Sequence, residues 1–427
     1  MEWLRQVPEH WNVLPLKRCF QIVGGSTPKS EIDSYWDGDI LWATSADLSK
    51  LRSLYINDTQ RKITADGLVS CATTLVSPGA ILLSTRAPIG SLAIAGNEMC
   101  TNQGCKSLVP FGHTNAKYFA LLMSISSSEL NIRGKGTTFL ELSGDELGSF
   151  KAPVPPVSEQ MRISEFLDRE LEKLDELVAE QQRLIELLKE KRQAVISHAV
   201  TKGLNPHAFM KPSGIEWLGD VPAHWEVTRL GNLFREVAEP GIDGLPILSV
   251  SIHDGVSDKE IAGEDMDRKV TRSEDRSKYI RVAPGDLVYN MMRAWQGGFG
   301  TVTVDGMVSP AYVVARPHRQ LKTDFIEHLL RTPQAIEQMR RHSQGVTDFR
   351  LRLYWDEFKN IRVALPPSEE ATAICAHIAD MDRTFKNMST VSEEAIRLLQ
   401  ERRTALISAA VTGQIDVRQL ANNKEAA

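Results

Sequence analysis

Few residues in this chain form a pattern that is typical of catalysis. GGSTPKS (Gly24–Ser30) resembles a phosphate-binding loop but lacks the glycine–lysine spacing of a P-loop, so a turn is the better interpretation. The metalloprotease pattern HExxH and the hydrolase pattern GxSxG do not occur. Cys100 and Cys105 are the closest cysteines, but no CxxC motif or nearby histidine pair accompanies them. We therefore expect no catalytic, cofactor-binding or metal-binding residues.

Motifs of DNA-modifying enzymes are also missing from the sequence. Both Pro-Pro pairs follow Val or Leu, whereas an amino-methyltransferase motif has Asp or Asn before them. No glycine-rich S-adenosylmethionine loop follows an expected strand, and no nuclease cluster of the PD…(D/E)xK type is present. The pattern favours a binding protein over a self-contained nuclease or methyltransferase.

Composition is that of a globular protein with room for more than one domain. The chain has 427 residues, of which 42% are hydrophobic and 25% charged. Its longest apolar stretch, Gly79–Gly96, is interrupted by Arg86 and Pro88, which argues against a membrane span. The first eleven residues do not resemble a signal peptide, and the five cysteines suggest reduced thiols. We expect a cytoplasmic protein that does not contact a membrane.

The chain contains a long internal repeat. EWLRQVPEHW (Glu2–Trp11) returns as EWLGDVPAHW (Glu216–Trp225), with seven of ten residues identical. LLKEKRQAVISHAVTKG (Leu187–Gly203) likewise returns as LLQERRTALISAAVTGQ (Leu398–Gln414). Similar order at similar offsets indicates two tandem copies of one unit rather than a solenoid. The decapeptide is then best interpreted as shared framework at the start of each copy.

Each copy ends in an expected long helix. Residues 158–200 contain no Pro or Gly, and apolar residues recur there at alternating spacings of four and three, which is a heptad pattern. A helix of about 40 residues would be roughly 60 Å long. The seam positions are Leu167, Leu171, Leu174, Val178, Gln181, Ile185, Leu188, Arg192, Val195 and Ala199 in the first copy, and Ile378, Phe385, Ile396, Leu399, Leu406 and Ala410 in the second.

These patterns predict a mixed α/β protein of two globular domains and two long helices. The expected order is a domain over 1–157, a helix over 158–203, a second domain over 204–366, a helix over 367–413 and a disordered tail over 414–427. An approximate twofold relation between the copies would make the helices pair as an antiparallel coiled coil. Two separate helices, each docked on its own domain, remain an alternative.

The order of the motifs resembles the specificity subunit (S subunit, HsdS) of type I restriction–modification systems. The resemblance rests on PxHWxV in both copies, on GGSTPKS and TNQG in the first, on MMRAWQGG in the second, and on the Pro-Pro boundaries with the helices that follow. It covers essentially the whole chain. Single motifs are weak, but their duplicated order is specific.

This resemblance implies a function and a set of partners. Each globular part would be a target recognition domain that reads one half of a bipartite, asymmetric double-stranded DNA sequence. The coiled coil would fix the spacer and dock two methyltransferase subunits, and two restriction subunits can join them. Adenine-N6 methylation and ATP-dependent cleavage, with S-adenosylmethionine, ATP and Mg, would belong to those partners and not to this non-catalytic chain.

Candidate base-reading residues follow from hydrogen-bonding chemistry. Arg and Lys suit guanine, Asn and Gln suit adenine, and loops that place them beside Gly are the candidates. In the first domain these are Thr27, Lys29, Arg86, Gln103, Lys106, Arg133, Lys135 and Thr137; in the second they are Arg293, Trp295, Gln296, Thr347, Arg350 and Arg352. For each of them a surface or framework role is the alternative. The matching places of Arg86 and Arg293 favour a shared role in phosphate positioning.

Charge limits what the chain can do alone. Residues 1–157 carry 14 basic and 14 acidic side chains, and residues 213–367 carry 20 and 22. We therefore expect weak, salt-sensitive DNA binding by the isolated chain, with partner subunits supplying the rest. A non-catalytic coiled-coil scaffold whose globular domains bind protein partners is the alternative function.

Overall fold

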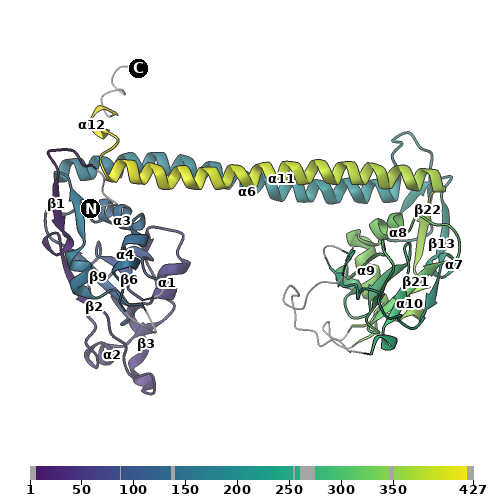
Figure 1. The fold of residues 1–427 in the computed structure, drawn as a ribbon, viewed down its shortest axis with the longest axis horizontal. Helices are drawn as coiled ribbons and strands as arrows, with labels where there is room; N and C mark the ends of the chain where they lie inside the picture. The colour runs from purple at the N-terminus through teal and green to yellow at the C-terminus, as the bar shows by residue number, and fades with distance from the viewer. Residues whose placement is uncertain are drawn as a thin grey trace. The chain divides into compact units, whose positions relative to one another are not determined.

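The computed structural model describes residues 6–86, 88–135, 140–252, 255–259, 275–345 and 351–420. The chain divides into two compact units, one of Met1–Gln182 with Glu393–Ala427 and one of Arg183–Ser392. Each unit contains one globular domain and parts of two long helices, α6 (Val157–Lys202) and α11 (Ser368–Val411), as Figure 1 shows.

The first domain is built on a five-stranded sheet of order β2-β9-β6-β7-β4. A smaller sheet of order β5-β3-β8 and the pair β1-β10 complete its strands. The strands are β1 (Asn12–Pro15), β2 (Phe20–Gly24), β3 (Trp36–Ala43), β4 (Tyr55–Ile56), β5 (Lys62–Ile63), β6 (Ile81–Ser84), β7 (Leu92–Ala95), β8 (Met99–Thr101), β9 (Cys105–Pro110) and β10 (Lys151–Val154). The helices are α1 (Ser45–Lys50), α2 (Ala65–Val69), α3 (Ala116–Ser124), α4 (Ser127–Arg133) and α5 (Gly144–Ser149).

The second domain has a four-stranded sheet of order β14-β21-β18-β19 and four strand pairs, β11-β12, β13-β22, β15-β16 and β17-β20. The strands are β11 (Met210–Pro212), β12 (Asp220–Pro222), β13 (Glu226–Arg229), β14 (Phe234–Val237), β15 (Val250–Ser251), β16 (Gly255–Val256), β17 (Ile280–Val282), β18 (Leu287–Asn290), β19 (Phe299–Thr301), β20 (Gly306–Val308), β21 (Tyr312–Pro317) and β22 (Arg362–Leu365). The helices are α7 (Leu230–Leu233), α8 (Thr323–Leu330), α9 (Pro333–His342) and α10 (Trp355–Phe358).

The two domains share a framework whose strands pair in the same register. Ile81 pairs with Leu108 in the first sheet, and Leu287 pairs with Ala315 in the second. The Pro-Gly turn before each of these strands is also the same, because Gly79 has a φ of 93° and Gly285 a φ of 92°, a conformation that favours glycine. Strands β2, β9, β6 and β7 therefore correspond to β14, β21, β18 and β19.

Within each unit the two long helices pack antiparallel along the predicted seam. In the first unit Leu167, Leu171 and Leu174 lie in one core cluster with Ile407 and Ala410. In the second, Ile196 and Ala199 share a cluster with Ile374 and Ile378. Residues late in α6 meet residues early in α11, and the reverse holds in the other unit, which confirms the antiparallel coiled coil and the mixed α/β class.

Arg192 and Arg403 also lie on the helix seam, and their partly exposed side chains bind carboxylates of the facing helix. Arg192 Nε lies 2.7 Å from Asp382 Oδ1 in the second unit, and Arg403 Nε lies 3.3 Å from Asp175 Oδ1 in the first. A long side chain on a seam can place its charge outside the apolar contact in this way. The heptad therefore continues through both arginines without a buried charge.

The His-Trp pair that closes each repeated decapeptide packs at the helix ends, in line with its framework interpretation. His10 Nε2 lies 2.9 Å from Glu159 Oε2, and His224 Nε2 lies 2.6 Å from Glu370 Oε2, so each copy anchors to the first turns of a long helix. The tryptophan that follows each histidine is buried, Trp11 at 6% and Trp225 at 1% exposure.

The segment that follows α11 differs from the tail expected over 414–427. Residues 417–420 form the short helix α12 (Val417–Leu420), and Val417 is only 4% exposed because it packs into the first core cluster. Burial of apolar side chains beside Trp11 provides the physical reason for order here. Residues 421–427 lie outside the described residues.

Candidate nucleic-acid interface

Two candidate residues of the first domain meet on adjoining loops. Thr27 follows β2 and Gln103 follows β8, and the Thr27 hydroxyl donates a hydrogen bond to Gln103 Oε1. Both side chains are exposed. Lys29 is exposed two residues further along, and its backbone oxygen accepts a hydrogen bond from the indole of Trp36. The structure thus places three sequence-predicted residues on a pair of fixed loops.

Arg86 lies beside the same loops but is already paired. Its Nε and one terminal nitrogen each lie 3.1 Å from Glu141 Oε2, and the backbone of Glu141 pairs with that of Lys135. Lys135 Nζ in turn lies 2.6 Å from Glu146 Oε1. These carboxylates reduce the positive charge that the two basic residues offer, although every side chain in the network is partly exposed.

The other candidates of the first domain have different surroundings. Lys106 is half-buried on β9, where it pairs with Leu83 of β6. The guanidinium of Arg133 lies 5.4 Å from the ring centroid of Phe150, a fully buried residue. Thr137 lies outside the described residues.

In the second domain three candidates gather directly after β18. Arg293 precedes a 3-10 turn at Ala294–Gln296, and Gly297 ends this turn with a φ of 92°. The Trp295 indole donates to the Met292 backbone oxygen at 3.1 Å, while Gln296 is exposed. Within the described residues Arg293 has no carboxylate within salt-bridge distance, unlike Arg86. The two arginines therefore share a place in the framework but not an environment.

A second segment reaches this turn from the far end of the domain. Gln344 and Arg352 pair through their backbones, and Leu353 N donates to the Met291 oxygen at 2.9 Å. Because Leu353 bonds to Met291, the neighbouring Arg352 lies close to the segment that carries Arg293. The side chain of Arg352 is exposed. Thr347 and Arg350 lie outside the described residues.

Sequence reasoning missed several residues that lie at these sites. Arg340 lies with its guanidinium carbon 5.9 Å from the Trp295 ring centroid, and Arg341 is its neighbour in the last turn of α9. A run of basic residues at the end of an amphipathic helix was the signal available in the sequence. Glu141, the partner of Arg86, carried no such signal, because its contact depends on tertiary structure.

Four of the five cysteines are buried, and Cys71 is partly exposed. Burial raises the pKa of the Cys100 thiol to about 11 and that of Cys105 to about 12. Across the described residues no group of three or more His, Cys, Asp or Glu side chains is placed to hold a metal ion. None of the helices in the described part of the chain is long and apolar enough to cross a membrane.

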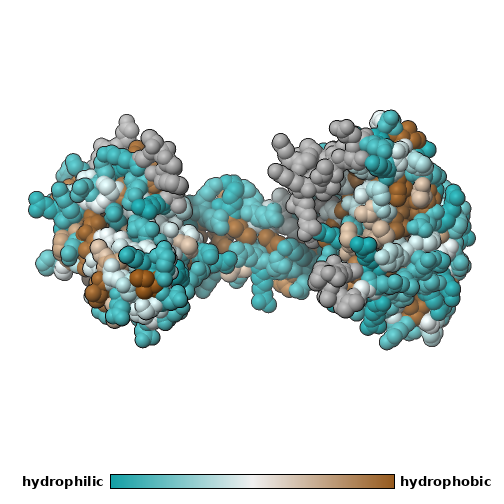
Figure 2. Space-filling model, turned by 90° about the horizontal axis from the view of Figure 1, so that it is seen from below, coloured by the Kyte–Doolittle hydropathy of each residue, from teal (hydrophilic) through white to brown (hydrophobic). Residues whose placement is uncertain are grey.

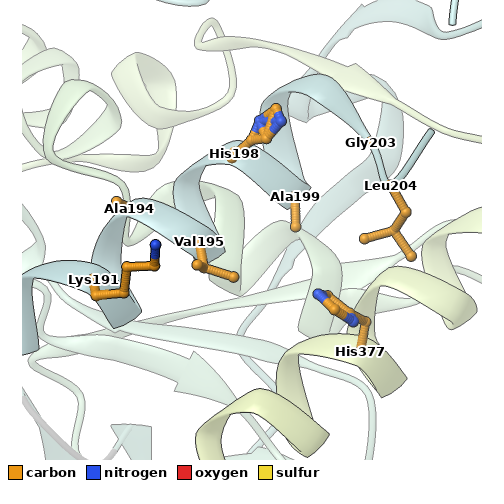
Figure 3. A pocket seen from close by; sticks show the side chains of 8 residues that line it. All are labelled: Lys191, Ala194, Val195, His198, Ala199, Gly203, Leu204 and His377. Carbon is orange, nitrogen blue, oxygen red and sulfur yellow. The ribbon is translucent and has the colours of Figure 1, made fainter. Parts of the chain in front are cut away.

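One cavity of about 320 Å³ lies in the second unit, between the end of α6 and the start of α11. Figure 3 shows small and apolar side chains around it, together with Lys191 and His198 on one helix and His377 on another, and the two imidazole rings do not meet. The cavity therefore has no converging polar groups of the kind that orient a small ligand.

The chain is similar to known specificity proteins of restriction systems. Residues 8–187 match the family model described as type I restriction modification DNA specificity domain. The type I restriction enzyme MjaIX specificity subunit of Methanocaldococcus jannaschii is 31% identical over 234 residues, which cover 54% of this chain and 53% of that protein. The MjaVIII specificity subunit of the same organism is 22% identical over 439 residues, covering 97% of this chain and 95% of the relative.

A solved structure shares the fold. The crystal structure of the HsdS subunit from Thermoanaerobacter tengcongensis superposes with a TM-score of 0.56 at 14% identity, covering 96% of this chain and 98% of that one. The sequence matches and the duplicated two-domain, two-helix fold agree. In sequence and in fold, the chain is therefore similar to type I restriction–modification specificity subunits over most of its length.

Proposed function

We propose that this chain selects the DNA target of a type I restriction–modification complex, with each domain reading one half of a bipartite, asymmetric sequence. The observation that carries the proposal is one strand framework, repeated in register, with different side chains on its loops. Gly25 after β2 has Glu239 as its counterpart after β14, and residues 102–104 after β8 correspond to 309–311 after β20. Two domains with the same strand framework but different side chains on their loops suit a non-palindromic target.

The proposed reader surfaces combine hydrogen-bonding and cationic groups. Gln103 and Gln296 are exposed amides, while Arg293 and Arg352 are cations without an ion-pair partner among the described residues. Amide groups suit adenine edges, and guanidinium groups suit guanine edges or phosphates. Because neither domain has a basic excess, binding by the isolated chain should be weak and should fall with salt.

The helix pair would fix the spacer between half-sites and dock methyltransferase subunits. In the second unit Leu184, Leu187, Met388 and Val391 are exposed at 39%, 49%, 47% and 70%. The Arg192–Asp382 pair sets a register in which Leu187 lies level with Met388 and Leu184 with Val391. Figure 2 shows brown patches on the exposed surface of the helices, and an apolar patch on a paired helix surface supports a protein interface.

Partner subunits would carry the chemistry in this proposal. Methyltransferase subunits would bind S-adenosylmethionine and methylate adenine N6, and restriction subunits would use ATP and Mg for cleavage. This chain would contribute no catalytic group and would act in the cytoplasm, where the DNA and these subunits meet.

Methylome sequencing of host cells with and without the gene tests the reading function. Loss of one bipartite N6-methyladenine motif on deletion is the expected result. An unchanged methylome would contradict the proposal and favour a scaffold whose domains bind protein.

Co-purification tests the docking surface separately. Leu187→Glu combined with Met388→Glu should abolish recovery of the methyltransferase subunit with this chain, because two charges would enter an apolar interface. Thr390→Glu is the matched control, since Thr390 is exposed on a different face of α11. Equal recovery with both variants would place the docking surface elsewhere.

A further inference from the structure

We propose that Gln103, oriented by Thr27, reads the edge of an adenine in the half-site bound by the first domain, and that Trp36 and Trp42 are positioning residues for this pair. The inference rests on the proposed DNA-reading function and adds a base identity and a mechanism of orientation. A single contact, between Gln103 and an adenine in the half-site of the first domain, can be tested separately from the DNA-reading function as a whole.

The hydrogen bond between Thr27 and Gln103 defines which way the amide faces. The Thr27 hydroxyl donates to Gln103 Oε1, so the oxygen of the amide is held on the Thr27 side. The Nε2 group keeps both of its protons, and Oε1 keeps a second lone pair. A glutamine amide with these free groups can donate to N7 and accept from the N6 amino group of adenine.

Backbone contacts hold the two loops together beneath this pair. Ser26 N donates to the Thr101 oxygen at 3.0 Å, and Gly25 N donates to the Cys105 oxygen at 3.3 Å. The loops approach so closely at Gly25 that a Cβ there would lie 2.0 Å from the Asn102 backbone oxygen. Only glycine fits at this place, which explains why the GGSTPKS loop has glycine immediately before its polar residues.

Two tryptophans also hold the Thr27 loop, through its backbone oxygens. Trp42 Nε1 donates to the Ser26 oxygen at 3.0 Å, and Trp36 Nε1 donates to the Lys29 oxygen at 3.2 Å, so the two bonds flank Thr27. The rings pack edge to face at 5.2 Å, and Arg61 stacks 3.7 Å from the Trp36 centroid. With exposures of 7% and 4%, both indoles are rigid supports. A polar group whose supporting residues are held in place by packing and hydrogen bonds is preorganised for selective binding.

The second domain lacks this arrangement at the corresponding loops. Glu239 replaces Gly25, and its carboxylate binds Arg316 at 2.7 Å instead of facing a partner loop. Ser309, Pro310 and Ala311 stand where the first domain has Asn102, Gln103 and Gly104. Changes at Thr27 or Gln103 should therefore alter one half-site only.

The test measures binding by the complex of the full chain with its methyltransferase subunits. Duplexes carry 7-deazaadenine, which lacks the N7 acceptor, in place of each adenine of each half-site in turn. One replacement in the half-site of the first domain should weaken wild-type binding about fivefold, the effect of one lost hydrogen bond. In Gln103→Ala the same replacement should cause no further loss.

Variants of the supporting residues separate orientation from simple contact. Thr27→Val removes the hydroxyl and should relax the preference for adenine at that position, while Thr27→Ser should keep it. Trp42→Phe removes the indole N–H and should relax the same position, with the other half-site unchanged. Gln320→Ala in the second domain is the matched control, because it exchanges an exposed glutamine that lies outside the proposed reader residues. Methylome motifs from each variant report base preference, and unfolding midpoints report stability.

Each outcome supports or contradicts a defined statement. A wild-type methylome without a bipartite motif would contradict the proposed function itself. A bipartite motif with no position of the first half-site sensitive to 7-deazaadenine, or with equal sensitivity in Gln103→Ala, would overturn only the adenine contact. Equal preferences in Thr27→Val and Thr27→Ser would overturn orientation by Thr27. Relaxation of both half-sites by Trp42→Phe would overturn its role as a positioning residue.

Discussion

Replacing Arg316 by valine is predicted to destabilise the second unit by about 3–5 kcal/mol. Arg316 Nε and one terminal nitrogen lie 3.0 and 2.9 Å from the two carboxylate oxygens of Asp286, whose side chain is only 2% exposed. Without the guanidinium this carboxylate would be buried with one remaining hydrogen bond, from Ala283 N at 2.9 Å. The lost contact with Glu239 adds little, because that side chain is 45% exposed.

The first domain supplies the matched control for this perturbation. In the shared register Ala80 stands where the second domain has Asp286, and Val109 stands where it has Arg316. The double variant Asp286→Ala, Arg316→Val removes the charge together with its partner, as the first domain does naturally. We expect it to recover most of the loss and to fall within about 2 kcal/mol of the wild type, because replacing a buried ion pair by apolar residues is often neutral.

Thermal unfolding of the full chain measures both variants. For a unit of this size 1 kcal/mol shifts the midpoint by about 2–4 °C, so the single variant should lower the transition of the second unit by about 6–20 °C. Hydrogen exchange in β18 and β21 assigns the change to that sheet. If the single and double variants unfold at the same temperature, the cost does not come from the unpaired carboxylate and the reasoning is wrong.

Three further predictions concern pH, glycine and thiols. Burial lowers the pKa of His328 below its ordinary value of 6.5. The stability that the neutral imidazole provides above pH 6.5 should therefore be lost as the pH falls below that value. Between pH 7.5 and 5.5 the unfolding midpoint should fall less in His328→Leu, a variant chosen because Leu121 stands at the same place in α3 of the first domain. Gly413→Ala should lower the unfolding midpoint more than Gly203→Ala. Both glycines have φ near 77°, so the backbone strain is similar. The new Cβ, however, would lie 2.4 Å from Pro8 Cδ in Gly413→Ala, but 3.1 Å from a flexible glutamate oxygen in Gly203→Ala. Native-state alkylation followed by mass spectrometry should label Cys71 first, because it is partly exposed whereas the other four cysteines are buried; faster labelling of any of those four would contradict this.

The long helices could be predicted from sequence because their signal is local and repeated. A heptad that continues from Leu167 to Ala199 without Pro or Gly leaves few other solutions. The duplication then indicated how the helices pair, since two copies in one chain suit an antiparallel arrangement. The partners of the arginines on the seam were not predicted: Arg192 and Arg403 bind carboxylates on the facing helix.

Side-chain contacts at the candidate interface could not be predicted in the same way. Thr27 and Gln103 are 76 residues apart in the sequence, and the pairing of β2 with β9, the strand that follows Gln103, brings the two loops together. The sequence placed Arg86 and Arg293 at matching positions, yet Glu141 binds only Arg86. A sequence match identifies the place of a residue in a framework, but its partners depend on tertiary structure that differs between the two copies.

The units that fold together are not continuous in sequence, and the decapeptide shows why. Trp11 near the N-terminus is buried in a cluster with Ile407, Ala410 and Val411 from the end of α11. Tyr118 in the middle of the first domain donates its hydroxyl to the Val411 oxygen at 2.9 Å. In the second unit Trp225 is buried with Ala199 and Val200 from the end of α6. The tryptophan that ends each decapeptide thus packs its domain against the long helix that ends beside it, which for the first copy is α11 near the other end of the chain.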